Sequence, residues 1–224
     1  MDHSAEIKAY GDYARAKNTE VRSDKLLEMA KCMEDGACRF TFLRKNARVE
    51  TYGTRCYSLI RESDQKAAAD FESRVTMYAS EGRFLYYDLL ERTWMMFDAA
   101  NLIAAFTVRT EIDLLAKYLV RAMRGVDSRA GKLSLLCGAD LKMQTEICVL
   151  KVEDIFANGC HRNIYGTRHA FIVGEMNPDC LDNMALKELR AQSAEGRFGC
   201  FNIATKAWEN IPATSIESIE EYDE

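Results

Sequence analysis

Hydrophobic and polar residues alternate in two widely separated stretches of the chain, and this alternation predicts short β-strands. In the first stretch we expect five strands, over about 37–44, 48–59, 83–89, 93–97 and 101–107. In the second stretch we expect five more, over about 146–156, 160–173, 197–203, 207–211 and 215–220. The pattern therefore predicts two β-rich regions of similar size.

Apolar residues at helical spacing predict helices around these strands. Leu26, Leu27, Ala30 and Met33 share one face of a helix that starts near Asp24. Further helical patterns cover 109–124, 184–192 and 4–17, and the long connections 61–80 and 174–195 are also helix-prone. The segment from Gly125 to Gly131 is the best flexible boundary between the two halves.

Two tetrapeptides occur twice in the chain. The first is Tyr52-Gly53-Thr54-Arg55, which recurs as Tyr165-Gly166-Thr167-Arg168. The second is Glu81-Gly82-Arg83-Phe84, which recurs as Glu195-Gly196-Arg197-Phe198 at nearly the same offset, and this offset also places Trp94 on Trp208. Two such matches in one register indicate an internal duplication.

The repeated glycines Gly53 and Gly166 fall in the middle of predicted strands, where a glycine usually marks a bulge or a sharp bend. Five bent strands favour a small closed barrel. We therefore predict an α+β protein of two tandem five-stranded β-barrels with flanking and linking helices. The predicted parts are a helical extension over 1–23, a first barrel over 24–108, a helical linker over 109–144 and a second barrel over 145–224.

The first half resembles a family of small Sm-like, Src-homology-3-like barrels, a second WYL-type family of Bacteroidetes and their phages. The resemblance rests on MEDGACRFTF at 33–42, YGTR at 52–55 and FLYYDLLERTWMMF at 84–97. The same order of motifs recurs more weakly from about 140 to 221. The chain departs from the family after each tryptophan, where Met95 or Glu209 replaces the usual basic or polar residue. The resemblance implies a fold, and its phage association suggests a virion or host-takeover protein.

Charge separates the two halves. The whole chain carries 30 Lys and Arg against 35 Asp and Glu, a net charge of -5, so no global basic field attracts nucleic acid. Residues 37–110 hold 11 basic and 9 acidic side chains, whereas 145–224 hold 7 and 14. The acidic end from Glu217 to Glu224 is interpreted as a solvated terminus, with masking of a basic face as the alternative.

Single-stranded nucleic acid is therefore a candidate ligand of the first half only. The residues expected to contact it are Arg39, Arg44, Lys45, Arg48, Arg55 and Arg83. The alternative is that the repeated arginines bond neighbouring carboxylates such as Glu81 or Glu195. A similar choice applies to the aromatic residues Tyr52, Tyr86, Tyr87 and Trp94, which form either a base-stacking platform or, at alternating strand positions, part of the core.

Catalytic signals are weak. His3, His161 and His169 show no metal-ligand spacing, and the eight cysteines include no Cys-x-x-Cys pair, so we expect reduced thiols and no catalytic residue, metal or cofactor. No apolar run is long enough to span a bilayer, and we expect a cytoplasmic protein without membrane contacts. The sequence thus favours a non-enzymatic binding or assembly module that contacts a protein partner or itself.

Overall fold

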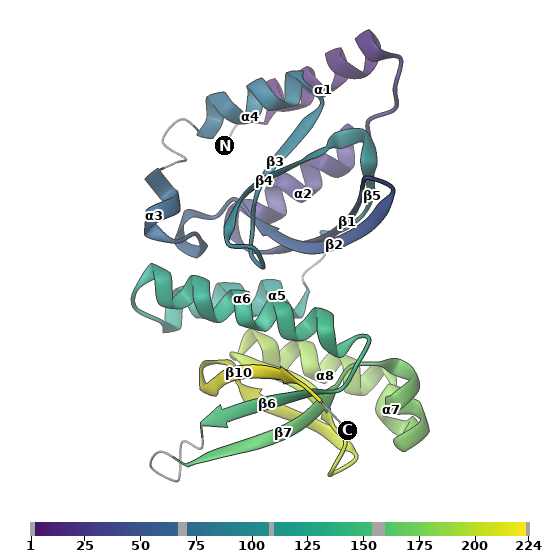
Figure 1. Cartoon of the computed structure of the whole chain (residues 1–224), viewed down its shortest axis with the longest axis vertical. Helices are drawn as coiled ribbons and strands as arrows, with labels where there is room; N and C mark the ends of the chain where they lie inside the picture. The colour runs from purple at the N-terminus through teal and green to yellow at the C-terminus, as the bar shows by residue number, and fades with distance from the viewer. Residues whose placement is uncertain (1–2, 67–70, 108–109, 154–159, 223–224) are drawn as a thin grey trace. The chain divides into compact units, whose positions relative to one another are not determined.

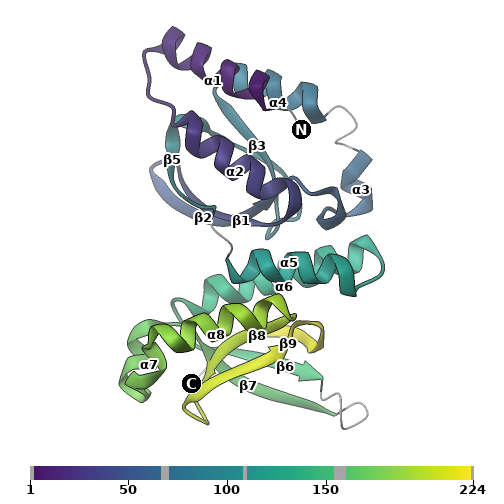
Figure 2. The same cartoon turned by 180° about the vertical axis from the view of Figure 1, so that it is seen from behind.

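The computed structural model describes residues 3–66, 71–107, 110–153 and 160–222, and it is a mixed α+β structure as predicted (Figure 1). Backbone contacts divide the chain into two compact units, seen from behind in Figure 2. The first unit comprises Met1–Thr110 and Gly125–Ala130, and the second comprises Glu111–Arg124 and Gly131–Glu224. Each unit contains one five-stranded antiparallel sheet.

The first unit begins with helices α1 (Ser4–Lys17) and α2 (Ser23–Asp35). Its strands are β1 (Cys38–Arg44), β2 (Ala47–Thr54), β3 (Arg83–Asp88), β4 (Thr93–Asp98) and β5 (Leu102–Phe106), in the sheet order β4-β3-β2-β1-β5. The segments between β2 and β3 are η1 (Tyr57–Leu59), α3 (Glu62–Gln65) and α4 (Phe71–Ser80), and the short turn η3 (Ala99–Asn101) precedes β5. Helix α1 packs against α4 (Figure 1).

The second unit follows the same order. It begins with α5 (Glu111–Ala122) and α6 (Val126–Met143), although the first residues of α6 group with the first unit. The strands are β6 (Cys148–Glu153), β7 (His161–Thr167), β8 (Arg197–Asn202), β9 (Ala207–Pro212) and β10 (Ile216–Glu221), in the order β10-β6-β7-β8-β9. The helical segments after α6 are α7 (Ala170–Met176), η4 (Pro178–Leu181), α8 (Asn183–Ala194) and η5 (Ala213–Ser215). Helix α5 packs against α8, as α1 packs against α4.

The core of the first unit lies between α2 and one face of the sheet. Phe40 and Phe42 alternate on β1 and point inward, because residues two apart lie on the same face of a strand. Both rings contact Phe97 from β4, with centroids 5.5 and 4.8 Å away. Helix α2 contributes Leu26 and Met33 to the same cluster. The strand alternation read from the sequence therefore identifies the core-facing side.

Neither sheet closes into the predicted barrel, which corrects that part of the expectation. The described ladders leave β4 and β5 as the two edges of the first sheet and β9 and β10 as the edges of the second. Among the described residues β5 pairs with β1 alone, and neither its other side nor the outer side of β4 has a partner strand. The sheet curls far enough for β4 and β1 rings to touch, but it stays open.

The two mid-strand glycines serve close packing, which differs from the predicted bulges. Gly53 pairs regularly with Cys38, and a Cβ atom there would lie 2.8 Å from Met33 Cε and Tyr86 Cδ2. A Cβ at Gly166 would lie 3.0 Å from Cys200 Sγ. The register shifts occur elsewhere, on β1 between Thr41 and Phe42 and on β10 between Ile216 and Ser218.

The helices that were predicted as an N-terminal extension and a linker instead belong to the two compact units. Residues 4–35 and 111–143 each form two helices that precede a sheet, and α5 has direct contacts with α8 and β8 inside the second unit. Helix α6 falls within the predicted helical linker but was not predicted as a separate helix, and Gly131, placed at a flexible boundary from the sequence, lies inside it. The end of the predicted strand over 146–156, from residue 154 on, lies outside the described residues.

Candidate functional site

Arg55 and Arg168 hold each unit together from the inside. The Arg55 side chain is 0% exposed, and its Nε and Nη2 donate to the carbonyl of Leu85 at 3.0 and 2.9 Å. Nη1 and Nη2 donate to the Glu6 carboxylate of α1 at 3.0 and 2.9 Å, and the guanidinium lies 4.3 Å from the Phe84 ring centroid. Arg55 therefore cannot contact a nucleic acid, and the expected binding role is corrected to a structural one.

The local reason for this arginine is the short β2–β3 ladder. Strand β3 pairs with β2 only at Tyr87 and Asp88, so earlier carbonyls on that side need other donors. Arg55 satisfies Leu85, and the Tyr10 hydroxyl donates to the carbonyl of Arg83 at 3.1 Å. The buried Arg55 and Tyr10 side chains thus donate hydrogen bonds to β3 carbonyls beyond the end of the β2–β3 ladder.

Glu6 is the carboxylate that balances Arg55. Burial raises the pKa of Glu6, but Arg55 and the neighbouring His3 lower it more, so the Glu6 pKa lies below its ordinary value. His3 Nδ1 lies 3.2 Å from Glu6 and His3 Nε2 lies 3.1 Å from Glu34. The first turn of α1 is therefore anchored to the sheet by an ionised, hydrogen-bonded cluster.

Arg168 repeats the arrangement in the second unit with a different carboxylate set. Its Nε donates to the carbonyl of Gly199 at 2.9 Å, and its guanidinium lies 4.3 Å from the Phe198 ring centroid. Nη2 lies 2.9 Å from Glu111 of α5, and Nη1 donates to Asp140 of α6. One arginine here joins two helices to the sheet, whereas Arg55 joins one.

Other residues repeated in the sequence also serve the fold. Thr54 Oγ1 donates to the carbonyl of Gly36 at 2.7 Å, and Thr167 Oγ1 donates to that of Glu146 at 3.0 Å. These contacts end β2 and β7, which is why both strands stop earlier than the alternation predicts. Gly82 and Gly196 adopt φ of +75° and +84°. Their missing Cβ atoms make room for the rings of Tyr13 and Tyr118, respectively.

Each tryptophan packs within its own unit. Trp94 Nε1 donates to the carbonyl of Asp64 at 3.1 Å, and Trp208 Nε1 donates to that of Cys180 at 2.8 Å. Their rings meet Tyr87 and Phe201 edge-on, at 5.6 and 6.0 Å between centroids. The neighbouring tyrosines Tyr52, Tyr86 and Tyr87 are buried, so these aromatic residues belong to the core and do not form an accessible stacking platform.

The expected basic residues separate into paired and exposed groups. Arg39 Nε donates to Glu50 at 2.7 Å, and Arg83 lies 4.0 Å from Glu81 as the structural alternative predicted. The exposed group lies at the β1–β2 turn and consists of Arg44, Lys45 and Arg48. In the second unit, Arg197 donates to the carbonyl of Asn210 at 3.4 Å. Among the expected basic residues, Arg44, Lys45 and Arg48 are therefore the exposed ones that lie together at one turn.

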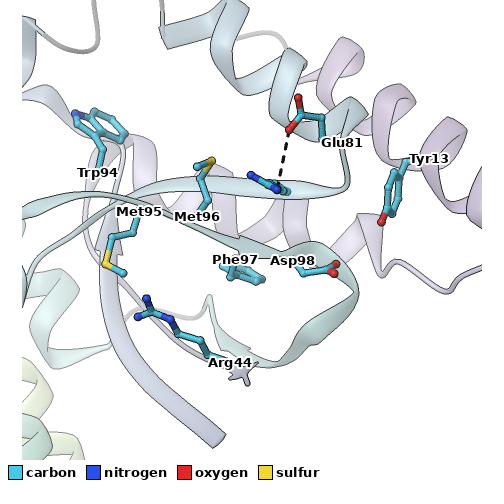
Figure 3. A pocket seen from close by; sticks show the side chains of 9 residues that line it. Tyr13, Arg44, Glu81, Trp94, Met95, Met96, Phe97 and Asp98 are labelled. Atoms are coloured by element: carbon cyan, nitrogen blue, oxygen red, sulfur yellow. Dashed lines mark ion pairs between the residues drawn. The ribbon is translucent and has the colours of Figure 1, made fainter. Parts of the chain in front are cut away.

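A groove of about 560 Å³ runs along β4 (Figure 3). Strand β4 supplies five of its lining residues, Trp94, Met95, Met96, Phe97 and Asp98. The remaining lining residues are Tyr13 from α1, Arg44 from β1, and Glu81 and Arg83 at the start of β3. We name this the β4 groove. Its lining combines apolar side chains with charged ones.

The β4 groove follows a strand edge that is open to a further strand. Ala99 N–H donates to the carbonyl of Gly82 at 2.8 Å, so bonded and non-bonded pairs alternate along β3–β4 from that point. This alternation directs the backbone of every second β4 residue away from β3. The residues whose N–H and C=O groups point outward are Trp94, Met96 and Asp98.

The corresponding edge of the second unit is protected. Strand β9 has Glu209 and Asn210 after its tryptophan, where β4 has Met95 and Met96. It ends at Pro212, which has no N–H to donate and occurs in sheets mainly at edges. Glu209 accepts from Asn202 at 2.9 Å and also pairs with Arg162. The two units thus share a scaffold but differ at this edge.

Thiol, metal and membrane features add little to this site. Burial raises the pKa of Cys200 to about 12 and that of Cys148 to about 11, so both thiols stay protonated near neutral pH. Within the described ranges, no group of three or more His, Cys, Asp or Glu residues is placed to hold a metal ion. None of the helices in the described part of the chain is long and apolar enough to cross a membrane.

Sequence reasoning identified the arginines but missed their partners and the groove. Glu6 and Asp140 lie far from Arg55 and Arg168 in the sequence, and no local pattern connects them. The groove did leave a signal, because β4 has two adjacent methionines where edge strands commonly carry charged residues or proline. No family model, curated protein or solved structure matches this chain.

Proposed function

We propose that this chain is a non-enzymatic binding module that arose by duplication of one small unit, and that the first unit captures a protein partner. The observation that carries the proposal is the contrast between the two edge strands. Strand β4 exposes Met96 beside a groove, whereas β9 presents Asn210 and Pro212 at the same places. A surface that only one of two equivalent units keeps open is typical of a binding site.

The residues that recur in both units support the same proposal. Arg55 and Arg168 bond carbonyls and carboxylates inside the fold, and Gly82 and Gly196 accommodate tyrosine rings. The two arginine side chains are therefore engaged inside the fold. The duplicated features therefore build the scaffold, and function belongs to what differs between the units.

The proposal is tested by capture from extract of the native cell with the full chain. Wild-type protein and a variant carrying Met96→Asn and Asp98→Pro, which copies the edge of β9, are compared side by side. We expect one partner protein to be recovered by the wild type and lost by the variant. Turnover of a substrate from a broad hydrolase panel, abolished by changing His161 or Cys160, would replace the proposal with an enzymatic function.

Single-stranded nucleic-acid binding is the second candidate, favoured by the exposed Arg44, Lys45 and Arg48 at one turn. Phosphate contacts of this kind weaken steeply with salt. We expect Arg44→Ala with Arg48→Ala to reduce binding to an oligonucleotide, and Arg15→Ala on α1 to leave it unchanged. No binding at low salt would remove this candidate.

The resemblance to the small-barrel family and its phages remains part of the proposal. It rests on the motifs at 33–42, 52–55 and 84–97, which fall in order on α2 and β1, on β2, and on β3 and β4. A virion or host-takeover role is the third candidate. The genes that flank this one distinguish it, since structural or early phage genes are expected nearby only in that case.

A further inference from the structure

We propose that the outer edge of β4 binds an extended segment of a partner protein by strand addition. The segment carries alternating apolar side chains and one Asp or Glu that pairs with Arg44. This inference rests on the proposed binding function and names the class of ligand and its site. It makes β4 the second-to-last strand of a six-stranded sheet in the complex.

The backbone of β4 provides the first argument. Trp94, Met96 and Asp98 direct N–H and C=O groups outward, and no other described strand pairs with them. An extended peptide satisfies such groups in one step, because every second residue pair of an added antiparallel strand exchanges main-chain bonds. Main-chain bonding supplies affinity with little sequence preference.

The side chains of the β4 groove provide the second argument. Met96 is 38% exposed, and Trp94 and Met95 are half-buried beside it. Figure 3 shows the Met95 and Met96 side chains leaving the strand in different directions, as neighbouring residues of a strand do. An added strand therefore finds a methionine on each face of the sheet, and methionine adapts to varied apolar partners. This favours apolar residues at alternate positions of the ligand.

The charges of the groove select an acidic residue in the ligand. Glu81 and Arg83 lie 4.0 Å apart and compensate each other, and Asp98 Oδ1 accepts the Ala100 N–H at 3.0 Å. Arg44 is exposed and has no carboxylate within ion-pair distance among the described residues. A carboxylate of the ligand therefore has one evident partner.

The same charges disfavour a second copy of this chain as the occupant. Strand β4 contains a single acidic residue, Asp98, and that carboxylate already caps η3. Pairing β4 with another β4 would bring two Arg44 side chains to the interface without a new acidic partner. A foreign segment with its own Asp or Glu fits the groove better.

The second unit shows what closes such an edge. Pro212 occupies the position of Asp98 and removes an outward N–H, while φ at Asp98 is -68°, a value that proline adopts without strain. Asp98→Pro therefore blocks strand addition on β4 by a change that the sister unit already tolerates. Asp98→Ala is its matched control, because alanine removes the same carboxylate and cap but keeps the N–H.

The test uses the full chain and a phage-displayed library of random dodecapeptides. We expect the selected peptides to share alternating apolar residues and at least one Asp or Glu. A fluorescein-labelled copy of the most enriched peptide is then titrated by fluorescence anisotropy. Asp98→Pro should weaken binding about tenfold relative to Asp98→Ala, the effect of losing roughly one main-chain hydrogen bond. Arg44→Glu should weaken binding of the acidic peptide but not of its amide counterpart.

Met77→Asn on α4 controls for loss of an exposed methionine, and we expect it to bind as wild type. Equal binding to Asp98→Pro and Asp98→Ala, or selection of peptides without acidic residues, would overturn the inference. A concentration-dependent dimer seen by light scattering would also overturn the inference, if Asp98→Pro abolishes the dimer and the peptide does not compete with its formation. If extract capture recovers a partner that Asp98→Pro still binds, the binding function stands and the strand-addition site fails.

Discussion

Each unit pairs one interior arginine with carboxylates, but the number of carboxylates differs between the units. Arg55 pairs with Glu6 from one helix, while Arg168 pairs with Glu111 and Asp140 from two helices. Both arginines bond an equivalent carbonyl and lie 4.3 Å from an equivalent phenylalanine ring. The guanidinium position is therefore fixed by the sheet, and the carboxylates vary with the helices that cover it.

The edge strands β4 and β9, unlike the interior arginine sites, carry side chains of different chemistry. The interior arginine site is equivalent in both units, but Met95 and Met96 on β4 correspond to Glu209 and Asn210 on β9. A shared scaffold tolerates change where side chains face solvent, since surface substitutions alter stability little. Shared residues therefore report the fold, and the proposed binding function is placed on residues that differ between the units.

The largest effect should come from removing Glu6. Glu6→Ala leaves the buried Arg55 without a carboxylate, and we expect a loss of about 3–5 kcal/mol in the unfolding free energy of the first unit. Asp140→Ala leaves Glu111 beside Arg168, so the second unit should lose only about 1.5–3 kcal/mol.

Urea unfolding followed by tryptophan fluorescence separates the units. Trp208→Phe leaves Trp94 as the reporter of the first unit, and Trp94→Phe leaves Trp208 as that of the second. Glu81→Ala, which removes a half-exposed carboxylate, is the control and should change stability by less than about 0.5 kcal/mol. Equal losses for Glu6→Ala and Asp140→Ala would contradict the difference in charge count.

Substitution of the turn glycines should have an intermediate effect and affect both units alike. Gly82→Ala and Gly196→Ala place a Cβ at positive φ against a tyrosine ring, and we expect each to cost about 2 kcal/mol. Part of the loss should return in Gly82→Ala with Tyr13→Ala. Gly138→Ala in α6 meets nothing within 4 Å and should instead stabilise by about 0.5–1 kcal/mol. A strong asymmetry between the two turns would argue against equivalent packing.

Acid should weaken the first unit through Glu6. The pKa of Glu6 is lower in the folded unit than its ordinary value of 4.5, so the unfolded chain takes up the proton first. The stability that the Glu6 carboxylate contributes is complete above about pH 4.5. It is lost as the pH falls through the pKa of Glu6 in the folded unit. Glu6→Gln should flatten the acid limb of a stability–pH curve measured on the Trp94 reporter. An unchanged slope would show that Glu6 is not the group that titrates.

The smallest effect on stability is expected at the divergent edge. Met96→Asn, which copies the second unit, should change the unfolding free energy by less than about 0.5 kcal/mol because the side chain is largely surface. Thermal and urea unfolding of the variant test this. A loss above about 1 kcal/mol would mean that Met96 is retained for packing, and the contrast between the edges would then no longer point to binding.

Local patterns in the sequence determined the strands and most of the helices. Alternation located all ten strands, and helical spacing located α1, α2, α5 and α8. Helical spacing did not indicate α6 as a separate helix, because Gly131 and Gly138 weaken its amphipathic pattern. Its buried face consists of residues that include Leu133, Leu136 and Met143. The two repeated tetrapeptides also marked residues whose surroundings correspond in the two units.

Tertiary structure alone decided the partners of those residues and whether each sheet closes. Glu6 meets Arg55, and Asp140 meets Arg168, only after helices and strands distant in sequence have packed together. The open edge of β4 likewise depends on which distant strands pair, since β4 pairs with β3 and β5 with β1 among the described residues, and short-range periodicity does not encode those pairings. Backbone periodicity is a local property of the chain, whereas ion pairs and sheet edges depend on which distant segments come into contact.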